Sequence, residues 1–97
     1  MVLDHDGGGI FSFLPVADRG EAVDFEGLFR TPHGLDLADH APLHSATFAR
    51  PRSVPELRKA LADPGGLRLI VVPVDRDANV KRFRELTAVA IAAAREQ

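Results

Sequence analysis

The chain has 97 residues, with 12 lysines and arginines against 14 aspartates and glutamates, and a formal net charge of -2. This length permits one small domain, and the charge balance disfavours nucleic acid or an anionic lipid surface as partner. There is no cysteine, which excludes disulfides and thiolate metal sites and is compatible with a cytoplasmic location.

The sequence predicts neither a signal peptide nor an integral membrane segment. Its first residues, "MVLDHDGGG", lack the basic region and apolar core of a secretory signal. The longest apolar run, Leu69 to Val74, is far too short to span a bilayer.

The first predicted element is the end of a buried strand at Val2 and Leu3, because the residues after it are polar or glycine. An initiator methionine so close to a strand end suggests that the chain is cut from a longer one. "GGGIFSFLP" then predicts a tight turn and a short helical segment that Pro15 ends or redirects. Residues 16–24 have the composition of a loop.

The middle of the chain predicts two helical segments. Apolar residues between Phe25 and Phe29 recur at i, i+3 and i+4, which is one face of a helix. Asp36 is placed to cap a second helix that runs to about Ser45, although Pro42 interrupts it.

The second half predicts two strands, each followed by a helix. "TFAR" is a short strand, and Ser53 to Glu56 has the spacing of a capping box for a helix from about Val54 to Ala62. "LRLIVVPV" is rich in β-branched residues, as expected of a parallel strand covered on both faces. The apolar spacing from about Ala78 to Arg95 predicts a long terminal helix.

Strands and helices alternate along the chain, which predicts the α/β class. We expect a partial parallel sheet with helices on both faces and right-handed crossovers. By length alone, residues 1–97 form one small domain at most.

The glycine run Gly7-Gly8-Gly9 is the most informative feature, since such a run persists where the chain turns sharply or where something lies against the backbone. A strand end, a glycine turn and a helix start together form a common phosphate site in open α/β sheets. The pattern is neither G-x-G-x-x-G nor a P-loop. Asp4, His5 and Asp6 could supply metal ligands, with apolar residues from Ile10 to Leu14 as a wall. The alternative is a solvated turn followed by ordinary core.

Three strings carry a resemblance to a known family: "DHDGGGIFSFLP", "FEGLFRTPHGLD" and "VDRDANV". They resemble the C-terminal end of the thiamine diphosphate-dependent 2-succinyl-5-enolpyruvyl-6-hydroxy-3-cyclohexene-1-carboxylate synthases of menaquinone biosynthesis (MenD), and the resemblance spans essentially the whole chain. It implies the C-terminal portion of a diphosphate-binding domain in a homo-oligomeric transferase. That enzyme would decarboxylate 2-oxoglutarate and add the succinyl unit to isochorismate, with thiamine diphosphate and Mg²⁺ or Mn²⁺ as cofactors.

The resemblance also assigns site residues. It places the cofactor against five residues: Gly7, Gly8, Ile10, Phe11 and Leu14. It directs the His5 side chain and the Gly7 carbonyl toward the metal, and implies no certain catalytic residue within the chain. Asp4 and His5 stand where the family has two asparagines. Imidazole suits Mg²⁺ less well than oxygen does, so a preference shifted toward Mn²⁺ is expected. Replacing Gly8 with valine is expected to weaken cofactor binding far more than it lowers thermal stability.

The other histidines have weaker claims to function. His33 is expected to order its loop, and His40 and His44 have a four-residue spacing but no third ligand to complete a zinc site. The alternative function is a free-standing small α/β module that binds a phosphate-bearing ligand or a protein without catalysis.

Overall fold

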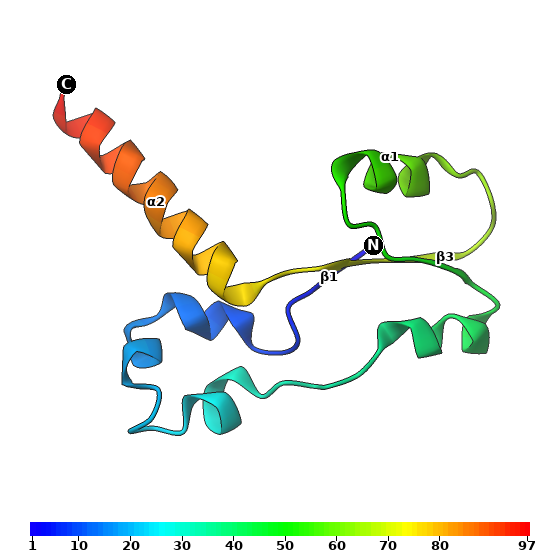
Figure 1. The fold of residues 1–97 in the computed structure, drawn as a ribbon, viewed down its shortest axis with the longest axis horizontal. Coiled ribbons are helices and arrows are strands. Elements are labelled where there is room, and N and C mark those ends of the chain that lie inside the picture. The colour runs from blue at the N-terminus through cyan, green and yellow to red at the C-terminus, as the bar shows by residue number, and fades with distance from the viewer. The chain divides into compact units, whose positions relative to one another are not determined.

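The structure is a computed structural model that describes residues 1–97, and the chain forms two compact units. Unit 1 comprises residues 1–6 and 33–74, and unit 2 comprises residues 7–32 and 75–97. Unit 1 holds β1 (Val2–Asp4), η4 (Leu37–His40), η5 (Pro42–His44), β2 (Thr47–Ala49), α1 (Val54–Ala62) and β3 (Arg68–Pro73) (Figure 1). Unit 2 holds η1 (Gly9–Phe13), η2 (Pro15–Arg19), η3 (Glu26–Arg30) and α2 (Arg76–Arg95).

Unit 1 is built on a parallel three-stranded sheet with strand order β1-β3-β2. Val2 pairs with Val71, and Phe48 pairs with Leu69. The central strand β3 carries the core, with Val71 only 1 % exposed. The α/β class and the buried parallel strand are therefore confirmed.

The first strand is present but is not buried in this chain. Val2 is 37 % exposed and Leu3 is 62 % exposed. β1 has only three residues and pairs with a neighbour on one side alone, so few side chains surround it. The expectation of a buried strand end was wrong in this respect.

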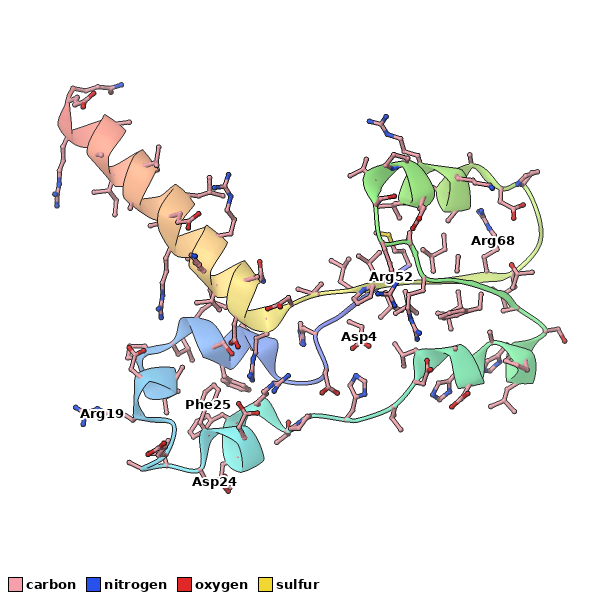
Figure 2. The ribbon with its side chains drawn as sticks, viewed as in Figure 1. Asp4, Arg19, Asp24, Phe25, Arg52 and Arg68 are labelled. Atoms are coloured by element: carbon pink, nitrogen blue, oxygen red, sulfur yellow. The ribbon has the colours of Figure 1, made fainter.

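Helix α1 begins and ends with side-chain hydrogen bonds. The Ser53 hydroxyl accepts from the Glu56 amide at 3.3 Å, and the Glu56 carboxylate accepts from the Arg52 amide at 2.7 Å. The predicted capping box is thus present with one difference. The Glu56 side chain accepts from the amide of Arg52, the residue before the cap, and not from the amide of Ser53 itself. Near the other end, the Arg68 guanidinium donates to the Ala60 carbonyl at 2.5 Å and so joins the start of β3 to α1 (Figure 2).

The segment from Asp36 to Ser45 is two short 3-10 helices, η4 and η5, and not the single helix that its sequence predicts. The predicted cap is confirmed, because the Asp36 carboxylate accepts from the Ala38 amide at 3.0 Å. Pro42 begins η5. Proline has no amide hydrogen to continue the preceding helix, so the helix stops and a new turn starts there.

Unit 2 is organised by five of the six phenylalanines of the chain. The Phe11 ring meets Phe29 edge to face at 5.8 Å, and Phe25 stacks on Phe29 at 5.9 Å. Phe13 meets Phe83 edge to face at 5.1 Å, which joins η1 to α2. These contacts replace the continuous core that a larger domain would have.

Two details of unit 2 differ from expectation. The predicted loop at residues 16–24 begins with the 3-10 helix η2. Leu28 is 70 % exposed although it was expected on the apolar face. Because η3 is a π-helix with i to i+5 hydrogen bonding, Phe25 and Phe29 stay on one face while Leu28 turns away.

The predicted terminal helix is confirmed as α2, and Asp75 caps it by accepting from the Ala78 amide at 2.8 Å. Val80 is its only buried residue, and the helix is exposed from Lys81 onward. Neither α1 nor α2 combines the length and apolar character that a bilayer-spanning helix needs.

Candidate functional site

The turn after β1 forms because Asp4 and Asp6 support an unusual backbone path. Asp6 has φ of +57° and Gly7 has φ of +103°, both in the left-handed region. Aspartate tolerates this region better than most residues, and glycine adopts it without strain. The Asp4 carboxylate accepts the Asp6 amide at 3.0 Å, which closes the first part of the turn. The sequence thus turns sharply as soon as the strand ends.

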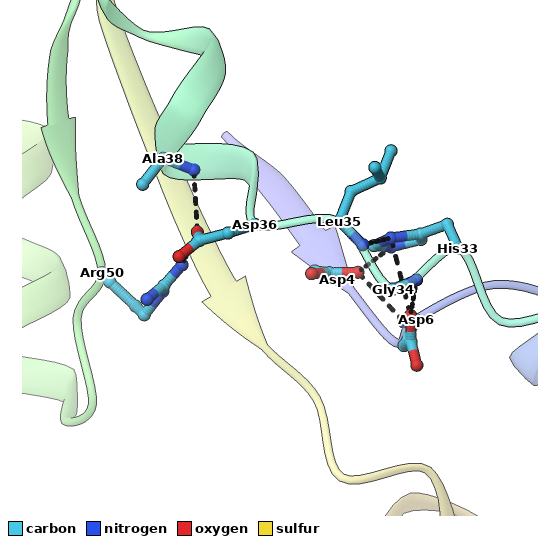
Figure 3. Close-up of polar contacts among 8 residues, drawn as sticks. All are labelled: Asp4, Asp6, His33, Gly34, Leu35, Asp36, Ala38 and Arg50. Atoms are coloured by element: carbon cyan, nitrogen blue, oxygen red, sulfur yellow. Dashed lines mark hydrogen bonds and ion pairs between the residues drawn. The ribbon is translucent and has the colours of Figure 1, made fainter.

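His33, which is distant in sequence but in the same unit, hydrogen-bonds to this turn (Figure 3). Its Nε2 lies 2.9 Å from Asp4 Oδ1, and its Nδ1 accepts the Leu35 amide at 2.9 Å. Since Nδ1 is an acceptor here, Nε2 carries the hydrogen and donates it to Asp4. The Gly34 amide also donates to Asp6 Oδ1 at 2.9 Å. The expectation that His33 orders its loop is confirmed, and both of its ring nitrogens are already used.

The same network lowers the pKa of Asp4. The largest cause is the hydrogen bond from the Asp6 backbone amide, followed by the hydrogen bond from His33. Both bonds favour the charged carboxylate, and their effect exceeds that of burial, which acts in the opposite direction. Asp4 is therefore held ionised at the end of β1.

A second carboxylate, Asp36, lies in the same unit and is held in a similar way (Figure 3). Its pKa is lowered first by the hydrogen bond from the Ala38 amide and then by Arg50, whose guanidinium donates to it at 2.5 Å. The Arg50 guanidinium also lies 5.1 Å from the centre of the Phe48 ring. The sequence predicted that Asp36 caps a helix, but it did not predict the contact with Arg50, because no local pattern indicates that contact.

The glycine run is explained by close approach of the chain's own backbone. A Cβ atom on Gly7 would lie 2.5 Å from the Thr31 carbonyl oxygen, and one on Gly8 would overlap the Phe29 carbonyl oxygen. The Gly8 amide donates to the Arg30 carbonyl at 2.5 Å, and the Gly9 amide donates to the Gly7 carbonyl at 2.6 Å. These two amides are therefore already bonded within the chain. The turn does not present them as a phosphate cradle.

The predicted apolar wall is divided. Ile10 is 68 % exposed and Leu14 is 45 % exposed, whereas Phe11 packs against Phe29 inside unit 2. Ile10 and Leu14 thus leave apolar surface beside the glycine turn.

The predicted metal donors are the His5 side chain, which is exposed, and the Gly7 carbonyl, which already accepts one hydrogen bond. No three histidine, aspartate or glutamate side chains among residues 1–97 are placed to hold a metal ion. Octahedral Mg²⁺ needs six ligands. These two donors therefore do not fit a metal centre by themselves, and this chain could supply only part of one. His40 and His44 end two separate short helices, η4 and η5.

Comparison with curated proteins shows close relatives. The chain is 48 % identical over 90 residues to the 2-succinyl-5-enolpyruvyl-6-hydroxy-3-cyclohexene-1-carboxylate synthase of Myxococcus xanthus, covering 91 % of this chain and 15 % of the relative. The synthases of Rubrobacter xylanophilus and Chloroflexus aurantiacus are 44 % and 45 % identical, covering 89 % of this chain and 15 % of each relative. The chain belongs to the MenD family.

The match is to the C-terminal part of MenD, and the chain spans about 15 % of the length of the curated relatives. No protein-family model matches the chain. The parallel α/β sheet fits the C-terminal part of the thiamine diphosphate-binding domain of MenD.

Proposed function

We propose that this chain is the C-terminal part of a thiamine diphosphate-dependent transferase of menaquinone biosynthesis. The complete enzyme would decarboxylate 2-oxoglutarate and add the succinyl unit to isochorismate. The observation that carries the proposal is 48 % identity over 91 % of the chain to a protein named as the synthase. Identity at this level along nearly the whole chain leaves little room for a different local architecture.

Within that enzyme, we assign this chain a binding and positioning role. Thiamine diphosphate, when bound, supplies the stabilised carbanion chemistry. Ile10 and Leu14 offer exposed apolar surface for the body of the cofactor, while Phe11 packs against Phe29 within unit 2. Gly7 and Gly8 let the turn pack closely enough to present that surface.

We propose that the remaining parts of the site come from outside these 97 residues. The resemblance implies that these parts are the other metal ligands, a glutamate that activates the pyrimidine ring, and basic residues that bind the substrate carboxylates. We propose that the complete enzyme is a cytoplasmic homo-oligomer whose active site lies between subunits.

The proposal is tested with the complete protein that contains this chain. Purified protein is assayed for release of carbon dioxide from 2-oxoglutarate and for consumption of isochorismate, with and without thiamine diphosphate. Turnover that requires isochorismate and the cofactor supports the proposal. If the reading frame contains no further synthase sequence, or if the complete protein binds no thiamine diphosphate, the free-standing module is the better explanation.

A further inference from the structure

Unit 2 contains an open groove of about 980 Å³ that uses none of the predicted cofactor or metal residues. Ser12, Phe25 and Val80 line it and are 7 %, 7 % and 8 % exposed. Figure 2 shows Phe25 inside unit 2, and Arg19 extending away from it. The groove therefore lies over the small core of the unit.

Two polar atoms at this groove have no partner. The Ser12 hydroxyl oxygen and Arg76 Nη1 are both buried, and neither makes a hydrogen bond. The other guanidinium nitrogens of Arg76 are engaged, Nη2 with Glu26 at 3.1 Å and Nε with Asp77 at 3.5 Å. Buried donors are almost always satisfied in folded proteins. No acceptor of the chain, the carboxylates of the groove included, therefore serves Ser12 Oγ or Arg76 Nη1.

The walls of the groove differ in charge. The charged residues on the wall before α2 are all acidic: Asp18, Glu21, Asp24 and Glu26, of which Glu26 is already paired with Arg30 and Arg76. The α2 wall carries the bases Arg76, Lys81 and Arg84 together with Asp77 and Glu85. An occupant that satisfies both walls must offer acceptors toward α2 and positive charge toward the carboxylates. A polypeptide provides both, through its carbonyls and its basic side chains.

We propose that a polypeptide segment of the complete protein, lying outside these 97 residues, occupies this groove and presents an acceptor to Ser12 and Arg76. The groove is open and lies at the upper end of the volumes of small-ligand pockets, which favours a chain segment over a small molecule. The curated relatives have several times the length of this chain, so such a segment is available in them. The inference rests on the proposed function only in requiring that the longer protein exists.

The occupant is identified by photo-crosslinking in the complete protein. Glu21, an exposed residue on the acidic wall, is replaced by p-benzoylphenylalanine, and the crosslinked peptides are sequenced by mass spectrometry. We expect a link to a segment outside residues 1–97 of the same subunit. Links only within residues 1–97, links to a second copy, or no link would overturn the proposal.

Ser12→Ala tests the missing acceptor without removing a hydrogen bond within the chain. If a segment accepts from Ser12, losing that bond should raise hydrogen exchange of the groove amides at residues 21–26 by about tenfold. If nothing accepts from Ser12, removing an unsatisfied hydroxyl should leave exchange unchanged or slower, and the proposal fails. Arg76→Met should reduce the crosslink yield, and Arg58→Met, at an exposed arginine in unit 1, is the matched control.

These results are independent of catalysis. A complete protein that shows the crosslink but no synthase activity would retain this inference and lose the proposed function. An active synthase without the crosslink would support the proposed function and overturn this inference.

Discussion

His33 Nε2 lies 2.9 Å from Asp4 Oδ1 and joins two segments of unit 1 that are 29 residues apart in sequence. His33 Nδ1 also accepts the Leu35 amide. One side chain therefore orders both the turn after β1 and the loop that follows Pro32.

His33→Ala should loosen this loop locally. Removing a hydrogen bond of this kind costs about 1 kcal/mol, so exchange of the Leu35 amide in the complete protein should become about fivefold faster. Hydrogen exchange with peptide-level mass spectrometry measures this change. His44→Ala, at an exposed histidine on η5, is the matched control and should have little effect. Equal exchange in the two variants would show that His33 does not hold the loop.

Asp4 should make stability depend on acid pH. Its pKa in the folded chain lies below the ordinary value of 3.8, chiefly because of the Asp6 amide and then His33. Its contribution is therefore fully present above 3.8 and is lost as pH falls through the lower folded value. We expect the complete protein to be more stable than its Asp4→Asn variant at pH 6, and the difference to shrink as pH falls below 3.8. Metal-free thermal melts at several pH values measure it. A gap that stays constant with pH would contradict the assignment.

Gly8→Val should destabilise the protein directly, contrary to what the sequence alone suggests. A Cβ on Gly8 would overlap the Phe29 carbonyl and lie 2.8 Å from the Phe11 ring. Overpacking of this kind costs about 1 to 3 kcal/mol or more. Thermal melts of the complete protein should show the loss, whereas Gly66→Ala, where no atom lies within 4 Å of the new Cβ, should melt like the parent. A Gly8→Val melting temperature equal to that of Gly66→Ala would refute the packing explanation.

His5→Asn should change which metal the complete protein prefers. His5 is exposed and stands where the resemblance places a metal ligand. Imidazole favours Mn²⁺ over Mg²⁺ relative to an amide oxygen, so the parent should work at least as well with Mn²⁺ and the variant should shift toward Mg²⁺. Metal titrations that follow both binding and activity measure the shift. An unchanged preference would remove His5 from the ligands.

The elements predicted well from sequence are those with local signals. The β-branched run of β3, the Ser53 capping box of α1 and the apolar spacing of α2 each lie within the element that they define. Pro42 likewise gave a local signal for the split between η4 and η5. The π-helix at Glu26–Arg30 was not predicted, because the apolar spacing does not specify i to i+5 hydrogen bonding.

The site was less predictable because its contacts cross the sequence. Only glycine fits at positions 7 and 8 because the backbone close to Thr31 approaches them, and the hydrogen-bond partner of Asp4 is His33. Either pairing requires knowledge of which distant segments meet. Composition and spacing identified the turn as special, but they could not show that the chain itself fills the space beside it.

The isolated 97-residue chain should neither catalyse the reaction nor bind thiamine diphosphate tightly. Both outer strands of the sheet, β1 and β2, have one edge without a partner, which favours association between chains. The donors at His5 and Gly7 are too few to fix a metal with the cofactor. Calorimetry with cofactor and Mg²⁺ should show no saturable binding, and a circular dichroism melt should be broad. Tight binding by a monomer with a cooperative melt would instead establish a free-standing module.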